Sequence, residues 1–331
     1  LYSFPYLRIL LLKSKKINFN IMRNIWENFC LVGYGKHSKS NLFPAMRKYK
    51  KVYVVSSKCN ITTNNQFYNL KDALNCLNNK TLFVLSNPPQ VHFEMACEVI
   101  SRGFDIMIEK PAFLTCQDAN KISSIINYDK IVFFELLMFK FTKMFSKFKI
   151  LWENNKENVK AINIKFKIPE FPNNTFRDKL GKKSCLYDIG CYPISLLRHI
   201  LPFKNTYNIN SFEYKNFQDQ KLNISSIISN ININIEIAVG KEYVNYVELI
   251  MEQNYSIKFD KFFYGKPGNK KIIFNSNFNL NIENFFDNNA FEEIFKIDKN
   301  FWLKSNYLRF KQMIEVTKSL EDLSKKLDSY E

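Results

Sequence analysis

Histidine and glycine are scarce in this chain of 331 residues, which contains three histidines and eight glycines. With so few histidines and no HExxH pattern, the sequence offers little from which to build a catalytic zinc site, so we expect no metal. The seven cysteines show no CxxC spacing, and most lie in apolar runs, where free cysteine behaves as a small hydrophobic residue. This usage is typical of a reducing compartment, and we expect a cytoplasmic protein.

Acidic residues are outnumbered, since 31 Asp and Glu face 48 Lys and Arg and leave a net charge of +17. Such a charge can indicate nucleic-acid binding, because clustered basic side chains release counterions from phosphate. Here the lysines are scattered along the chain rather than gathered in one stripe, which favours a solvated basic surface. We therefore expect no nucleic-acid partner.

Long hydrophobic runs are absent as well. No apolar run reaches the length needed to span a bilayer, so we expect no membrane partner. The first segment pairs a short apolar stretch at 9–12 with Lys13, Lys15 and Lys16, and in a signal peptide the charge comes first. We interpret residues 1–27 as an extension outside the folded core and expect translation to begin at Met22.

Short apolar runs alternate with helical periodicity from residue 28 to 148. This alternation is typical of a doubly wound parallel sheet and predicts a Rossmann dinucleotide-binding domain over 28–148. We expect strands at 29–32, 51–55, 81–85, 105–108 and 130–134, and helices at 42–49, 70–78 and 91–101.

From 149 to 331 the pattern changes to strands in which apolar and polar residues alternate. We expect them at 161–168, 222–228, 231–239, 243–251, 256–263 and 271–274. They predict an α+β domain for substrate binding and oligomerisation, with a large, open and mainly antiparallel sheet. A helix from about Leu186 should cover one face, and a partner subunit the other, in a homodimer or homotetramer. An apolar stripe marks a closing helix and comprises Tyr307, Phe310, Ile314, Leu320 and Leu323.

The first predicted strand runs into Gly33-Tyr-Gly35-Lys36-His37-Ser38. The segment matches the dinucleotide-binding pattern GxGxxG except that Ser38 replaces the third glycine, and serine is small enough for close helix packing. Taken alone, the motif is equally compatible with an ordinary βα turn.

The second predicted strand ends at Ser56-Ser57-Lys58, without the acidic residue that would bind the ribose hydroxyl of NAD. Two hydroxyls and an ammonium suit a 2'-phosphate instead, so we expect NADP(H), with NAD(H) as an alternative. A basic surface turn would have the same composition.

The third predicted strand runs into Ser86-Asn87-Pro88, and a second proline, Pro89, follows. The prolines stop the ladder and keep the chain extended along the carboxyl edge of the sheet, where a dinucleotide lies. We expect these three residues at the cofactor. His92 lies just beyond this segment. We expect it to be a residue at a helix start that packs near the cofactor rather than a proton shuttle.

Two further motifs carry the chemistry of hydride transfer, which needs a proton donor. Glu109-Lys110-Pro111 ends the fourth predicted strand, where a cation can bind the reacting oxygen and lower the pKa of a neighbouring acid. Asp188 and Tyr192 are four residues apart, hence on one face of a helix. A phenol is a weak acid at neutral pH until a cation lies beside it, and Lys110 would be that cation. A buried core tyrosine is the alternative reading.

With these motifs the chain resembles the glucose-fructose oxidoreductase, inositol dehydrogenase and rhizopine catabolism family (Gfo/Idh/MocA). The resemblance runs from about Phe29 to Leu201. It includes Ser86-Asn-Pro-Pro89 with His92, Ile108-Glu-Lys-Pro111 and Leu186-Tyr-Asp-Ile-Gly-Cys-Tyr-Pro193. The tyrosine at 192 looks like the NADP-linked branch of sugar and dihydrodiol dehydrogenases and of nucleotide-sugar 3-ketoreductases.

This resemblance implies that Lys110 and Tyr192 assist proton transfer, that Asp188 orders the site, and that Glu109 lies at the cofactor. It also implies that Glu135 and Met138 line the region near nicotinamide and substrate. Two features depart from the family's pattern and bear on the loop at the substrate. Residues 181–185 replace a segment that is glycine-rich in the family, and Lys140 stands where arginine is common.

The sequence thus predicts an NADP(H)-dependent oxidoreductase that transfers hydride to or from a sugar, such as the keto group of a nucleotide-linked or free hexose. Asn174 and Arg177 are expected at the substrate, where Arg177 would suit a diphosphate, although it equally resembles a loop arginine in water. The alternatives are an aldose 1-dehydrogenase or dihydrodiol dehydrogenase and, in another class, a non-catalytic protein that senses dinucleotides.

Overall fold

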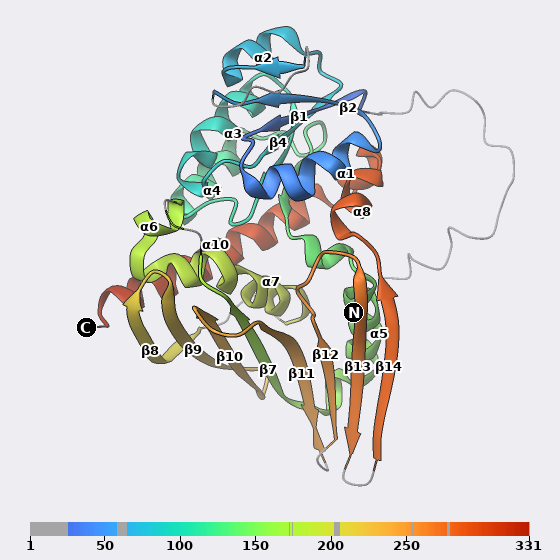
Figure 1. The fold of residues 1–331 in the computed structure, drawn as a ribbon, viewed down its shortest axis with the longest axis vertical. Helices are drawn as coiled ribbons and strands as arrows, with labels where there is room; N and C mark the ends of the chain where they lie inside the picture. The colour runs from blue at the N-terminus through green and yellow to red at the C-terminus, as the bar shows by residue number, and fades with distance from the viewer. Residues whose placement is uncertain are drawn as a thin grey trace, which may run out of the picture.

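Two β-sheets with helices between and around them make up the fold (Figure 1). The computed structural model describes residues 26–57, 65–171, 173, 175–201, 206–252, 255–276 and 279–330. The predictions for Met22, Lys58 and Asn174 therefore lie outside the described residues, as does most of the predicted extension.

The first sheet has six parallel strands in the order β3-β2-β1-β4-β5-β6. Their bounds are β1 Asn28–Val32, β2 Lys51–Val55, β3 Gln66–Phe67, β4 Thr81–Leu85, β5 Asp105–Glu109 and β6 Phe133–Leu136. The Rossmann-type sheet is thus confirmed. The strand expected at 130–134 starts later because residues 128–130 form a turn, and the short β3 was not predicted.

Helices from both ends of the chain cover this sheet. They are α1 Phe43–Arg47, α2 Leu70–Cys76, α3 His92–Ser101, α4 Cys116–Ile125, α8 Ala290–Lys296, α9 Lys299–Leu303 and α10 Asn306–Asp328. Apolar residues of α2, α3, α4 and α10 pack on one face, and those of α1, α8 and α9 pack on the other. Because residues beyond 289 return to this sheet, the division of the chain at 148 stays a prediction.

The second sheet has eight strands in the order β14-β13-β12-β11-β7-β10-β9-β8. Their bounds are β7 Val159–Ile168, β8 Asn208–Asn216, β9 Asp219–Ile228, β10 Ile231–Val239, β11 Val244–Met251, β12 Ser256–Asp260, β13 Gly268–Ser276 and β14 Asn279–Asp287. Neighbours are antiparallel except β7 and β10, so the mainly antiparallel sheet is confirmed. The strand expected at 256–263 is shorter because Lys261 adopts a left-handed conformation, with φ of 56°.

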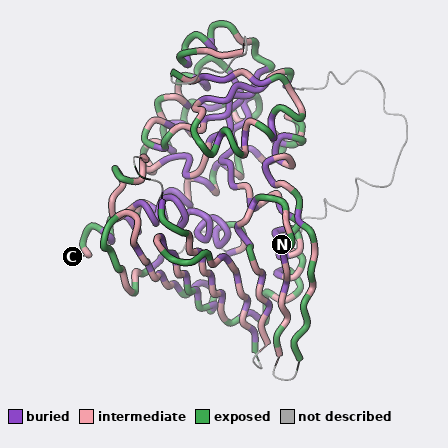
Figure 2. Tube along the Cα trace, in the orientation of Figure 1, coloured by how far each residue is buried: buried purple, intermediate pink, exposed green. Residues whose placement is uncertain are grey.

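The inner face of the second sheet is covered by α5 Lys143–Asn155 and α7 Cys191–Ile200, and α10 packs on α7 (Figure 1). Short turns complete this layer: η3 Met138–Phe141, η4 Lys156–Asn158, α6 Phe176–Leu180, η5 Gly181–Lys183 and the π-helical η6 Leu186–Gly190. Figure 2 shows that central strands of the first sheet such as β4 are buried along their length, whereas burial alternates along strands of the second sheet such as β9.

The closing helix α10 carries most of the predicted apolar stripe. Phe310, Leu320 and Leu323 are buried and Ile314 is half-buried. Tyr307 is 51% exposed, so its place in the stripe was wrong: it lies in the first turn and packs edge-on against Tyr128. Within the described residues, no helix is long and apolar enough to cross a membrane.

Candidate functional site

Lys110 and Asp188 form the centre of the site. Lys110 follows β5 at the carboxyl edge of the first sheet, and its Nζ lies 2.8 Å from Oδ1 of Asp188 and 2.6 Å from the backbone oxygen of the same residue. The side chains are 14% and 7% exposed. Burial alone would raise the pKa of Asp188, but the charges of Lys110 and Arg177 outweigh it and lower this pKa to about 2.

The charge of Lys110 is likewise held in place by its surroundings. Burial acts to lower the pKa of the ammonium, but the negative charge of Asp188 opposes burial and raises this pKa overall. The pair therefore stays ionised at neutral pH. A fixed cation at the end of a parallel strand is suited to bind an oxygen on which negative charge develops.

Tyr192 lies against this pair, in the first turn of α7. Nζ of Lys110 lies 4.9 Å from the centroid of the Tyr192 ring, and the hydroxyl donates to Sδ of Met138 at 3.2 Å. The ring is buried against Phe166 and Phe263. Burial raises the pKa of Tyr192 well above its usual range, although the charge of Lys110 opposes the shift. The phenol is therefore protonated in this arrangement.

The local sequence explains how Asp188 and Tyr192 come to face the same lysine. Asp188 lies in the π-helical turn η6, which leads directly into α7, so the predicted four-residue spacing holds although this turn is not α-helical. Pro193 falls in the first turn of α7, where a missing amide is tolerated. A Cβ on Gly190 would lie 3.0 Å from Cδ1 of Ile237, so the turn lies close against β10 and leaves little room for a side chain at this position.

Arg177 completes the charged cluster from the other side of Asp188. Its Nε lies 3.0 Å from Oδ2 of Asp188, and its guanidinium lies 4.6 Å from the ring centroids of both Phe171 and Phe176. Among the described residues, Nη1 and Nη2 have no hydrogen-bond partner. Within the described part of the chain, the two aromatic rings and the carboxylate thus hold the guanidinium and leave Nη1 and Nη2 without a hydrogen bond.

The predicted phosphate loop lies at the end of β1. Gly33 has φ of 91°, and a Cβ there would lie 3.0 Å from the backbone of Ser86, so this turn requires glycine. A Cβ on Gly35 would meet no atom within 4 Å. Ser38 and Ser86 share a hydrogen bond of 2.7 Å between their hydroxyls, which joins this loop to the end of β4. Lys36 is exposed.

The loop also carries His37, which contacts the strand end that bears Lys110. Nε2 of His37 lies 3.0 Å from Oε1 of Glu109, and Nδ1 accepts from Nδ2 of Asn41 at 3.1 Å. Oε2 of Glu109 accepts from the backbone N–H of Lys110 at 3.2 Å. Burial acts to raise the pKa of Glu109, but His37 and Lys110 outweigh it and lower this pKa.

His92 and Glu135 brace the strand ends from inside. Both ring nitrogens of the fully buried His92 face backbone oxygens, at 2.8 Å from Asn87 and 3.1 Å from Ala112, so neither is free for a ligand. Oε1 of Glu135 accepts from the backbone N–H of Ala112 at 2.9 Å, and burial raises the pKa of Glu135. Lys140 is half-buried, and burial lowers its pKa to about 8 although Glu135 opposes this shift.

The remaining predicted cofactor residues surround the carboxyl edge of the first sheet. Pro88 precedes the short helix η2 Pro89–Val91. Oδ1 of Asn87 is buried and has no hydrogen-bond partner among the described residues. At the end of β2, Ser57 is exposed and Ser56 donates its backbone N–H to the oxygen of Phe67.

The structure adds residues that the sequence did not single out. Phe171 and Phe176 stack on Arg177, and Asn41 orients His37. The spacing of four between His37 and Asn41 was a signal for the second of these contacts. Within the described residues, no group of three or more His, Cys, Asp and Glu is placed to hold a metal ion, and the described cysteines are free.

No family model matches the sequence, and no curated protein is significantly similar to it. Solved structures do resemble the fold. The 3-ketoreductase KijD10 from Actinomadura kijaniata, in complex with NADP and TDP-benzene, is 12% identical, with a TM-score of 0.72 over 90% of this chain and 97% of that chain. A dehydrogenase from Chromobacterium violaceum is 14% identical, with a TM-score of 0.71 over 91% and 96% of the two chains. At these identities the similarity shows a shared fold.

Proposed function

We propose that this protein is an NADP(H)-dependent oxidoreductase that reduces the keto group of a sugar. The observation that carries the proposal is the buried cluster of Lys110, Asp188 and Tyr192 at the carboxyl edge of a Rossmann-type sheet. Ligands of such sheets bind outside the carboxyl ends of the strands. An ionised lysine and a protonated phenol at that edge are the groups that a carbonyl reduction needs.

The residues present fit a dinucleotide. The open space at Gly35 and the close approach of Gly33 to Ser86 leave a cradle at the start of η1 Ser38–Leu42, where a diphosphate would lie. Oδ1 of Asn87, which is buried and bonded to no described residue, would accept a hydrogen bond from the ligand. When bound, the nicotinamide supplies the hydride. Ser56 and Ser57 offer no carboxylate against a 2'-phosphate, which supports NADP(H) over NAD(H).

The protonation states favour the reductive direction. Because burial raises the pKa of Tyr192, the phenol retains its proton and is suited to donate it to an oxygen that is becoming an alkoxide. Lys110, charged and held by Asp188, would stabilise the same oxygen and ease the loss of the phenolic proton. A dehydrogenase running in the oxidative direction would need the phenolate as its base, which this environment disfavours.

Arg177 supports a nucleotide-linked sugar as substrate. Its Nη1 and Nη2, to which no described residue is hydrogen-bonded, would hold a diphosphate in a bidentate manner. The similar structure of KijD10 contains a TDP ligand, which agrees with this class of substrate. Met138, at the hydroxyl of Tyr192, would then lie beside the sugar.

A substrate panel tests the proposal. The purified protein is incubated with NADPH and nucleotide-linked or free keto sugars and, in separate reactions, with NADP and aldoses or a dihydrodiol, and the nicotinamide absorbance is followed. Oxidation of NADPH by a keto sugar supports the proposal, and faster oxidation of the nucleotide-linked form supports the role of Arg177. Reduction of NADP by aldoses or diols alone would favour the dehydrogenase alternative. Tight NADPH binding without any turnover would favour a dinucleotide sensor.

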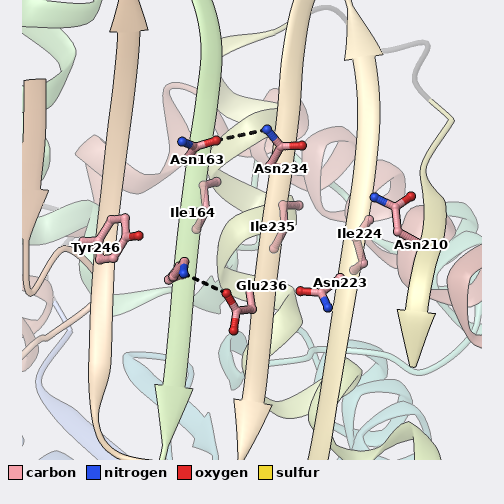
Figure 3. Close-up of a pocket in the computed structure, with 10 residues that line it drawn as sticks. Asn163, Ile164, Asn210, Asn223, Ile224, Asn234, Ile235, Glu236 and Tyr246 are labelled. Atoms are coloured by element: carbon pink, nitrogen blue, oxygen red, sulfur yellow. Dashed lines mark hydrogen bonds and ion pairs between the residues drawn. The ribbon is translucent and has the colours of Figure 1, made fainter. Parts of the chain in front are cut away.

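The outer face of the second sheet is the surface we assign to a second copy of the chain. A shallow hollow lies there, lined by amide, charged and aromatic side chains (Figure 3): Asn163, Lys165, Asn210, Asn223, Asn234, Glu236 and Tyr246. By strand register, Ile227 and Ile282 share this face and are 74% and 44% exposed. Sedimentation of the wild type and of Ile227→Asp measures the oligomeric state and tests this assignment. A dimer that forms through this face should dissociate in the variant.

A further inference from the structure

His37 stands out because it joins two parts of the site that are far apart in the sequence. Its Nε2 lies 3.0 Å from Oε1 of Glu109, which is 72 residues away and directly precedes Lys110. The side chain of His37 is 43% exposed and that of Glu109 is 12% exposed. A half-exposed histidine in the phosphate loop thus holds a buried carboxylate at the end of β5.

The orientation of His37 is defined from three sides. Asn41 donates from Nδ2 to Nδ1 of His37, which leaves the ring proton on Nε2, where it points at Glu109. The ring packs edge-on against Phe291 of α8, with centroids 5.6 Å apart. A side chain fixed in this way acts as a specific hydrogen-bond donor rather than as a loosely held surface charge.

Lys110 has two neighbouring carboxylates, Glu109 in the sequence and Asp188 in space, yet it pairs with only one of them. Within the described structure its ammonium forms an ion pair with Asp188 and none with Glu109, although Glu109 is its immediate neighbour. The oxygens of Glu109 are used by His37 and by the backbone N–H of Lys110. Without the bond from His37, Oε1 of this carboxylate would lack a donor, and Lys110 is a neighbouring cation whose charge already acts on Glu109.

We propose that His37 is a positioning residue: by binding Glu109 it keeps this carboxylate away from Lys110, so that the ammonium stays with Asp188 and Tyr192. The phosphate loop thereby sets the geometry of the lysine as well as offering a cradle for a diphosphate. The kinetic side of this inference rests on the proposed oxidoreductase function. Its structural side does not, because the contacts of Lys110 can be observed without turnover.

Two substitutions separate this role from a general effect on the loop. In His37→Gln the amide nitrogen lies close to the position of Nε2 and can still donate to Glu109. In His37→Asn the amide nitrogen lies close to the position of Nδ1 and falls short of Glu109. The experiment combines crystal structures of both variants without ligand and steady-state kinetics with NADPH and the best substrate of the panel.

We expect His37→Asn to turn Glu109 toward Nζ of Lys110, to about 3 Å, and to lower kcat about tenfold, with a much smaller change in KM for NADPH. His37→Gln should keep Glu109 in place and retain most of kcat. Equal losses in both variants, a rise in KM alone, or an unmoved Glu109 in His37→Asn would each overturn the proposal. If the wild type turns over no substrate, the proposed function fails, and the crystal structures alone decide on His37.

Discussion

Asp188 accepts two hydrogen bonds from the ammonium of Lys110, at 2.8 Å through its carboxylate and at 2.6 Å through its backbone oxygen. The cation is thus anchored to the turn that leads into α7, and the same turn sets the position of Tyr192. The lysine comes from the first sheet and the other two residues from the layer on the second, so the site exists only when the two sheets are assembled.

Replacing Lys110 with Met should abolish most turnover without abolishing cofactor binding. The ammonium acts on the developing alkoxide, so we expect kcat to fall by about 100-fold to 10,000-fold, whereas the phosphate loop is untouched. Steady-state kinetics and a fluorescence titration with NADPH measure the two effects. Equal losses of turnover and of NADPH affinity would show that the lysine is structural.

Tyr192→Phe should reduce turnover to a similar extent, because it removes the proton donor and keeps the ring on which Lys110 lies. The matched control is Tyr187→Phe, which removes a phenol oxygen that donates to the backbone oxygen of Leu114, away from the charged cluster. We expect the control to keep its kcat. A variant Tyr192→Phe as active as this control would remove the phenol from the mechanism.

Asp188 should make the stability of the protein depend on pH in the acid range. Its pKa is about 2 when folded. That value lies below the pKa of about 3.9 in the unfolded chain. Ionised Asp188 therefore contributes about 2 kcal/mol to the free energy of unfolding at pH values above the unfolded pKa, and this contribution is lost as the pH falls toward 2. Asp188→Asn lacks this contribution. Urea denaturation should therefore give a difference between wild type and variant that shrinks from pH 7 to pH 3, and a constant difference would contradict the assignment.

The two glycines of the phosphate loop should respond differently to alanine. Gly35→Ala places a methyl group where no protein atom lies within 4 Å, so we expect unchanged stability and weakened NADPH binding. Gly33→Ala combines a φ of 91° with a contact of 3.0 Å to Ser86, so we expect a lower free energy of unfolding. Thermal unfolding and NADPH titration of both variants test this contrast. Unchanged NADPH affinity in Gly35→Ala would place the diphosphate elsewhere.

Lys270 and Asp287 form an ion pair whose side chains are 1% and 0% exposed. Asp287 also accepts from the backbone N–H groups of Lys143 and Met144 at the start of α5. Asp287→Asn leaves a buried ammonium unpaired and should lower the free energy of unfolding by about 3 to 5 kcal/mol. The exposed pair of Lys183 and Asp328 is the control, because Asp328→Asn should cost less than about 1 kcal/mol. Equal losses in the free energy of unfolding of the two variants, measured by urea denaturation, would refute the structural role of the buried pair.

Strands with a buried face could be predicted from the sequence, and the two edge strands of the second sheet could not. In β10 the isoleucines alternate with polar residues, and its bounds match the prediction. Most side chains of β8 and β14 are exposed or half-buried, so neither edge strand carries an apolar period. Both gain their structure from pairing with a neighbour, which no local pattern records.

The catalytic candidates could be predicted because each belongs to a short motif. Lys110, Asp188 and Tyr192 were expected together, and the structure brings them into contact. The bond between His37 and Glu109 could not be predicted, because it depends on the order β1-β4-β5, in which β4 alone separates β1, which leads into the loop of His37, from β5, which ends at Glu109. The sequence also suggested that Lys110 lowers the pKa of Tyr192, whereas burial dominates and raises it.

Deuterium transfer tests the central claim most directly. NADPH labelled with deuterium at C4, on each face of the ring in turn, is mixed with a nucleotide-linked keto sugar, and the product is analysed by mass spectrometry. We predict that one of the two labelled forms gives a product sugar carrying one deuterium, and that Lys110→Met and Tyr192→Phe give little product. Tight NADPH binding with no deuterium in any sugar of the panel would contradict the account.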